Sequence, residues 1–434
     1  KQQNWREVSK IVRGRLKALA QVEPGQQHVE LFAKLGETYE NMLDAKTALV
    51  AYDQAARISA KIGEEEEKNK TRREKVMRLA VQLGTDALDK AIDHGHALIA
   101  ANPMELETYH RLVELYLKQG SRDRARALSR TLKFLKQADE AELELVDSGG
   151  GPGLVHRTLS RDNWRHDVYH PLEDPRLSDL FALIWPMVAA REGRTHAHHQ
   201  VARADRIEVT LQSPTELARF LAHACQIFDA PVPDFFVRDD ETGAIVIDAL
   251  VDKKSGDEKT MFPSVLAGKV ALSDTNETSM KFRAGRAIAR ARPEHILGAV
   301  LPSASALRHA VYGAIRVADP SAEIPSDAES AVAAHASAIG RYLPPSRLEQ
   351  LKSIAQRVRD HGDVDCRGWV QGLAYTATRA GFVLCDSLEV AAQILTREGD
   401  DGSPITAKER IRDLVGYSVS EPYLRLRKAV GLAR

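Results

Sequence analysis

The stretch Met280–Arg290, with the sequence MKFRAGRAIAR, decides how the C-terminal half of this chain is interpreted. Small and apolar residues recur in it at helical spacing, which predicts a helix over residues 278–292. Arg283, Arg286 and Arg290 fall on one face of that helix and give it a basic side. The helix is therefore amphipathic, and the elements that pack against it define the fold of this half.

Short strands and further helices are predicted around this stretch. Ser213-Pro214 begins a helix over residues 215–228. Residues 234–237 and 243–248 have the pattern of strands on either side of a turn, and residues 263–272 are predicted as a strand pair or a strand with a bend. Further helices are predicted over residues 327–342, 346–360, 367–384, 405–416 and 420–432.

The order of these elements resembles that of HtpX-type zinc metallopeptidases, over roughly residues 205–395. That family has a small mixed sheet followed by a helix of the pattern F-x-x-(A/G)-H-E-x-x-H. Arg286, Ala287 and Arg290 stand where the family has His, Glu and His. The resemblance implies an α+β domain with a peptidase fold and a changed active site.

The third zinc ligand of the family comes from a later helix with the pattern E-x-x-x-D. Ala374 and Thr378 stand at those two positions. Zinc needs imidazole and carboxylate ligands, and a glutamate beside the first His acts as general base. Arginine cannot deprotonate to bind a cation. The resemblance therefore implies a degenerate domain with no metal, no cofactor and no catalytic residue.

The N-terminal third has the small and aromatic spacing of paired helices. Residues 35–39 read Leu-Gly-x-x-Tyr, and the pattern recurs in part at residues 112–116. These residues resemble tetratricopeptide repeats, which implies about three helix pairs in an α-solenoid. The residues predicted to pack the repeats are Leu35, Gly36, Tyr39, Ala48, Tyr52, Leu112, Tyr116 and Ala125.

Repeats of this kind bind peptides or helices of other proteins in a concave groove. Side chains that could line the groove are Asn41, Lys46, Lys75, Arg78 and Arg111. The alternative is that the repeats only pack onto the rest of the chain. The middle repeat is expected to carry an insertion at Gly63–Lys68, whose acidic run is otherwise the solvated start of a helix.

A glycine-rich stretch at residues 147–153 marks the clearest domain boundary. The chain is thus divided into helical repeats (1–146), a linker with an irregular His-rich segment (147–204) and the α+β domain (205–434). The expected fold class is mainly α with one small sheet.

Three other clusters contain residue types that occur in metal or catalytic sites. His196-Ala197-His198-His199 and His166-x-x-x-His170 lack further ligands at a suggestive spacing, so a polar loop is favoured over a metal site. Cys366 near His361 has the residue types of a nucleophile pair, but Asp363 or Asp365 as a helix N-cap is favoured there.

Composition excludes several classes of function. Lys plus Arg and Asp plus Glu number 61 each, and aromatic residues make up 6%, so nucleic acid is not an expected partner. Three cysteines without paired spacing predict free thiols in a reducing compartment, the cytoplasm. The longest apolar run, residues 181–190, is interrupted by Pro186 and too short to span a membrane.

The resulting prediction is a non-enzymatic scaffold or adaptor that binds other proteins through its repeats. One alternative is an enzyme whose Arg286 and Arg290 hold an anionic substrate. Another is a structural subunit of a larger assembly.

Overall fold

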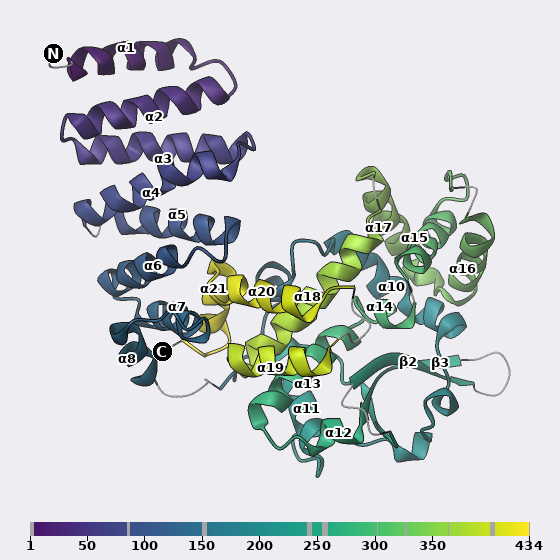
Figure 1. The fold of residues 1–434 in the computed structure, drawn as a ribbon. Helices are drawn as coiled ribbons and strands as arrows, with labels where there is room; N and C mark the ends of the chain where they lie inside the picture. Colours follow the sequence, from purple (N-terminus) through teal and green to yellow (C-terminus); the bar gives the residue numbers. More distant parts are fainter. Residues whose placement is uncertain are drawn as a thin grey trace. The chain divides into compact units, whose positions relative to one another are not determined.

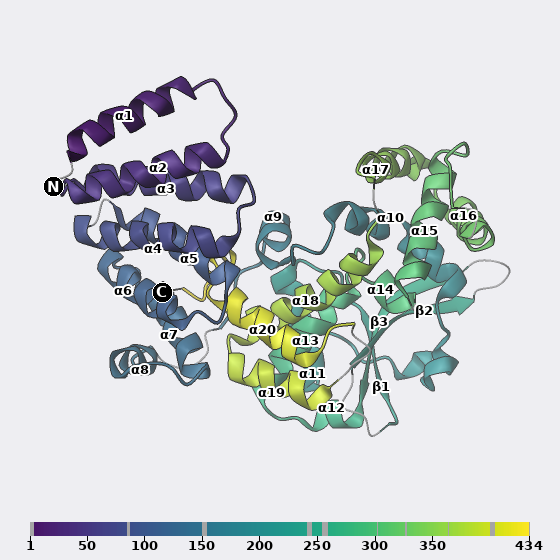
Figure 2. The ribbon, with the colours of Figure 1, turned by 45° about the horizontal axis from the view of Figure 1, so that its top comes forward.

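Helices form most of the computed structural model, together with one small sheet, which confirms the predicted fold class (Figures 1 and 2). The structure describes residues 4–84, 87–149, 154–240, 245–253, 259–301, 303–325, 328–362, 364–399 and 404–433. The chain forms two compact units. The first contains residues 1–151 and 415–424, and the second contains residues 152–414 and 425–434.

The first unit is a succession of helices, each of which packs against the next in sequence (Figure 1). Its helices are α1 (Trp5–Ala18), α2 (Gln26–Asn41), α3 (Ala45–Lys61), α4 (Glu66–Leu83), α5 (Leu88–Ala101), α6 (Leu106–Gln119), α7 (Arg122–Phe134) and α8 (Glu140–Asp147). The order fits paired helices, while the tetratricopeptide class stays a prediction.

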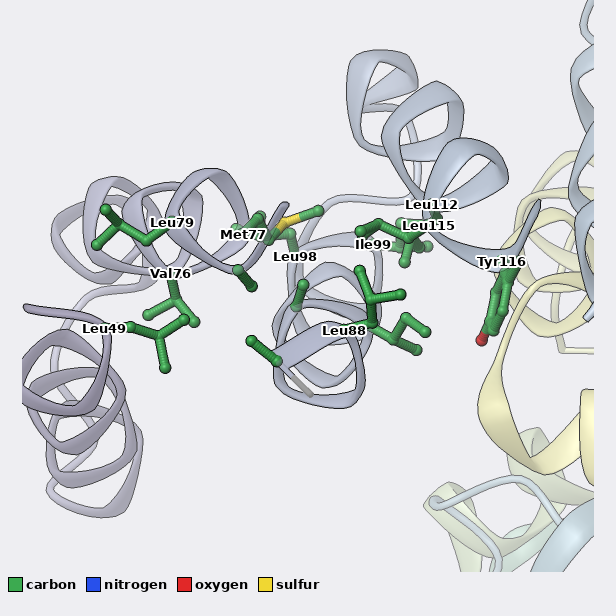
Figure 3. Close-up of a cluster of buried hydrophobic side chains, with 14 of the residues drawn as sticks. Leu49, Val76, Met77, Leu79, Leu88, Leu98, Ile99, Leu112, Leu115 and Tyr116 are labelled. Atoms are coloured by element: carbon green, nitrogen blue, oxygen red, sulfur yellow. The ribbon is translucent and has the colours of Figure 1, made fainter. Parts of the chain in front are cut away.

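All eight residues that the sequence analysis placed between the repeats are buried. Figure 3 shows part of this core, with Leu49, Val76 and Leu112 between neighbouring helices. Gly36 is required for close packing, because a Cβ there would lie 2.8 Å from the ring of Tyr52. Burial of such side chains, at about 25 cal/mol per Å² of apolar surface, is the main force that holds the helices together.

The predicted insertion at Gly63–Lys68 is wrong. The α3 helix ends at Lys61 and α4 begins at Glu66, so only a short turn separates them. The extra chain length is taken up by long helices instead. The alternative, a solvated acidic helix start, holds for Glu65 and Glu67, which are exposed at the beginning of α4. It fails for Glu64, which bonds to Arg72 and Ser59 at 2.6 Å each. Burial alone would raise its pKa, but these hydrogen bonds lower the pKa of Glu64 to about 2.

The second unit contains the sheet and the helices α9 to α19, while the last two helices, α20 and α21, are divided between the units because residues 415–424 belong to the first. The bounds of these helices are α9 (Arg161–Asn163), α10 (Pro175–Glu192), α11 (Glu216–Phe228), α12 (Lys269–Ser273), α13 (Glu277–Ala291), α14 (Leu297–Val300), α15 (Ala304–Ala318), α16 (Glu329–Tyr342), α17 (Leu348–Asp360), α18 (Cys366–Cys385), α19 (Leu388–Glu398), α20 (Ala407–Ser418) and α21 (Glu421–Ala429).

The sheet has the strand order β1-β3-β2, formed by β1 (Asp234–Arg238), β2 (Ile245–Lys253) and β3 (Lys259–Gly268). The central strand β3 pairs parallel with β1 and antiparallel with β2. The prediction of strand over residues 263–272 is wrong at its end, because Lys269 begins the α12 helix. The predicted turn before residue 245 lies largely outside the described residues.

One segment, residues 194–207, here called the sheet strap, forms a single backbone bridge with the strand at each outer edge of the sheet. The amide of Val251 in β2 donates to the carbonyl of Arg194 at 2.9 Å, and the amide of Ile207 donates to the carbonyl of Phe235 in β1 at 2.8 Å. Val201, in the middle of the strap, packs on one face of the sheet. The strap therefore protects edges that would otherwise present unpaired backbone groups.

Candidate functional site

The two helices that the resemblance selects, α13 and α18, are in backbone contact. A Cβ at Gly285 would lie 2.8 Å from both the carbonyl oxygen of Ala380 and the Cα of Gly381. A Cβ at Gly381 would lie 2.6 Å from the carbonyl oxygen of Phe282. Glycine at both positions lets the helix axes approach closely. Such a contact fits a pair of former ligand helices, and that ancestry stays a proposal.

The arginines of α13 are engaged inside the protein. The Nη1 atom of Arg286 lies 2.6 Å from Oε2 of Glu398, at the end of α19. The Nε atom of Arg283 lies 3.1 Å from the other oxygen of the same carboxylate, and its Nη1 lies 3.5 Å from Asp274. Both arginines are buried. Two guanidinium groups are thus matched by two carboxylates. Arg286 donates to Glu398 with an N–H group that an anionic substrate would otherwise accept from.

The remaining positions of the degenerate site carry little chemistry. Ala287 is buried and offers only a methyl group. Thr378 is fully buried, and its hydroxyl donates to the carbonyl of Ala374 at 2.8 Å, within its own helix. Arg290 lies one turn beyond Arg286 and is half-buried. None of these groups provides the imidazole or carboxylate that zinc requires.

The stretch His196–His199 of the His-rich segment lies in the sheet strap, and two of its imidazoles pair with acids on β2. The Nδ1 atom of His196 lies 3.1 Å from Asp252, and Nε2 of His199 lies 2.8 Å from Asp248. The Nε2 atom of His196 is buried without a hydrogen-bond partner, and the imidazole lies edge-on to the ring of Phe236. Burial, and then the charge of Arg203, lower the pKa of His196. These pairs hold the strap on the sheet.

The other two clusters also have structural explanations. His166 is exposed, whereas the imidazole of His170 stacks on the ring of Tyr375 at 4.4 Å. Cys366 is buried, which raises the pKa of its thiol to about 12 and makes it a poor nucleophile. The carboxylate of Asp365 accepts from the amide of Gly368 at 2.8 Å as the cap of α18, and Asp363 lies outside the described residues.

One group within the described part of the chain has the spacing of metal ligands: His110, Asp139 and Glu142. Asp139 and Glu142 form a capping box at the start of α8, since each side chain accepts from the amide of the other residue. The Nδ1 atom of His110 lies 2.8 Å from Glu142. The helix cap therefore accounts for this cluster without a metal.

Sequence reasoning missed a hydrogen-bonded series of buried polar side chains in the second unit. The Nε2 atom of His295 lies 2.6 Å from Oε1 of Glu173, which also accepts from the hydroxyl of Ser178 at 3.0 Å. Both members of the pair are buried, and Oε2 of Glu173 has no hydrogen-bond partner. Glu173 lies in a proline-flanked loop and His295 after α13, so no local spacing connects them. The Pro293-Glu294-His295 end of the helix was the one available signal.

No protein-family model matches this chain, and neither a curated protein nor a solved structure matches it significantly. None of the described helices combines the length and apolarity needed to cross a membrane. The three cysteines are buried free thiols, as the sequence predicted.

Proposed function

We propose that this chain is a non-catalytic adaptor, in which the helices of the first unit bind another protein and the second unit is a peptidase-like domain without peptidase chemistry. The observation that carries the proposal is the buried pairing of Arg283 and Arg286 with Glu398. In the family that the sequence resembles, a metal ligand stands at the position of Arg286. An internal ion pair there supports a packing role for the helix.

The binding surface proposed for the first unit includes Lys75 and Arg78 on α4. The ammonium group of Lys75 donates to the hydroxyl of Tyr52 at 3.0 Å and lies over its ring. Arg78 pairs with Glu40 of α2 and is about half exposed. Two cations on α4 beside an acid on α2 give a polar surface that a peptide or helix could recognise by charge complementarity.

The experiment is capture of partner proteins by the full chain, compared with the double variant Lys75→Ala/Arg78→Ala. We expect proteins retained by the parent to be lost from the double variant. Thermal unfolding should change only modestly, because Arg78 is exposed and Lys75 is half-buried rather than part of the core. The matched control is Arg122→Ala, an exposed cation on α7. Identical capture by all three proteins would contradict a binding role for this surface.

Metal content separates this proposal from a hydrolase. Elemental analysis of the purified chain is expected to find no stoichiometric zinc. Zinc bound one to one, lost together with a measurable peptidase activity on chelation, would overturn the adaptor function.

The alternative of an enzyme that holds an anion with Arg286 gains no support from a guanidinium already bonded to Glu398.

A further inference from the structure

Three arginines of the second unit converge on a single carboxylate, that of Asp179 in α10. Arg165 lies in a short π-helical turn, Trp164–Val168, and donates a hydrogen bond to Oδ1 of Asp179. The Nη2 atom of Arg161 in α9 lies 3.7 Å from the same oxygen. The Nη2 atom of Arg357 in α17 lies 3.8 Å from Oδ2. Two segments far apart in sequence, residues 161–168 and α17, thus bring three cations to one carboxylate.

One carboxylate cannot neutralise three guanidinium groups, so this cluster keeps an excess of two positive charges. Within the described residues, Asp179 is the only acid at ion-pair distance of Arg161 or Arg357. Arg379 of the same unit, by contrast, is matched by the single carboxylate of Asp413. At this cluster, positive charge therefore exceeds the negative charge beside it.

The unmatched guanidinium groups are accessible. The side chains of Arg161 and Arg357 are 75% and 54% exposed, while Asp179 is 17% exposed beneath them. Both distances to the carboxylate exceed hydrogen-bond length, so these two arginines keep their N–H donors for another acceptor. The half-buried carboxylate of Asp179 holds Arg165 by a hydrogen bond, whereas the guanidinium groups of Arg161 and Arg357 face solvent.

We propose that Arg161, Arg165 and Arg357 form a binding site for a phosphate monoester. Such a group carries close to two negative charges at neutral pH, which matches the excess charge of the cluster. Its oxygens accept the paired N–H donors that a guanidinium presents in one plane. This site lies in the second unit and does not depend on the adaptor function proposed for the first.

Binding is tested by calorimetry of the full chain at low salt with two probes: inorganic phosphate and a phosphoserine pentapeptide. The unphosphorylated pentapeptide is the reference. The expected result is saturable binding that weakens as salt is raised. Tighter binding of the phosphopeptide than of phosphate assigns the site to a modified protein segment. Tighter binding of phosphate assigns it to a small phosphorylated ligand.

The decisive variant is Arg161→Ala/Arg357→Ala, which should weaken phosphate binding on the order of tenfold, since it removes two exposed ion pairs that are individually weak. Arg359→Ala is the matched control, because Arg359 lies on the same helix but pairs with Asp319 at 2.5 Å. Asp179→Asn removes the competing carboxylate and should tighten binding. Absence of binding, or equal binding by the double variant and the control, would overturn the proposal.

Discussion

At the scale of single residues, the hydrogen-bond directions around Glu173 fix how many protons its pair with His295 holds. The carbonyl of Ala289 can only accept, so Nδ1 of His295 carries a proton. The indole of Trp369 can only donate to Ser178, so the Ser178 hydroxyl donates to Glu173. One further proton remains between Nε2 and Oε1. The pair is thus a charged imidazolium and carboxylate, or its neutral equivalent, inside an apolar core.

Removing one member of this pair should be costly. We expect His295→Ala to lower the free energy of unfolding by about 3–5 kcal/mol, because it leaves a buried carboxylate without its partner. His198→Ala, at an exposed imidazole, should change stability by less than about 0.5 kcal/mol. Urea unfolding at neutral pH measures both. Equal effects would show that the buried pair contributes no more than a surface histidine.

The same pair predicts a dependence of stability on pH. Burial acts to lower the pKa of His295, but the charges of Glu173 and Glu294 outweigh it and raise that pKa above 6.5. The folded state then holds the proton more tightly than the unfolded chain. The contribution of the pair to the free energy of unfolding is complete below about pH 6.5, and it is lost as pH rises through the pKa of His295 in the folded state. Between pH 6 and 9, the urea concentration at the midpoint of unfolding should fall more steeply with pH for the parent than for Glu173→Gln.

At the scale of elements, the contact between α13 and α18 depends on glycine. We expect Gly285→Ala to cost about 1–3 kcal/mol, because its methyl group would meet backbone atoms of α18 that cannot move aside without separating the helices. Gly340→Ala in α16 is the control, since its Cβ would have only an ordinary contact with Val317 at 3.9 Å. That change should be neutral or stabilising by up to about 1 kcal/mol. Thermal unfolding of both variants checks the contrast.

The helices were predictable because their signals are local. The predicted helix over 278–292 is found at Glu277–Ala291, and the one over 367–384 at Cys366–Cys385. The apolar run at residues 263–272 was predicted as strand throughout, although its last residues are helical, because periodicity in a short run does not separate strand from helix. The pairing of Arg286 with Glu398 joins residues far apart in sequence, and spacing carries no information about such contacts.

At the scale of the whole molecule, the chain returns to its first unit near the C-terminus. Residues 415–424 belong to that unit, although the sequence analysis assigned them to the C-terminal domain. Arg124 of α7 forms a bidentate ion pair with Glu421, in which its Nη1 and Nη2 atoms lie 2.7 and 2.9 Å from the two carboxylate oxygens. Ser418 bonds to Thr131 of the same helix at 2.9 Å. Val419 is fully buried in the core of the first unit.

Because of this return, neighbouring residues near the C-terminus should stabilise different units. Val419→Ala removes a side chain from the first core and is expected to speed hydrogen exchange in α5, α6 and α7. Leu426→Ala removes a fully buried side chain that belongs to the second unit and should speed exchange there instead. Large-to-small changes of this kind cost about 1–4 kcal/mol and open the core that loses the contact.

Hydrogen exchange followed by mass spectrometry resolves the two patterns on the full chain. The comparison has its own control, because both variants lie within a few residues of each other and alter a buried aliphatic side chain. If each variant loosened both units alike, the two cores would not be separate, and residues 415–424 would not be a distinct part of the first. If each loosens its own unit, the end of this chain is a structural component of the helical unit that the adaptor proposal uses for binding.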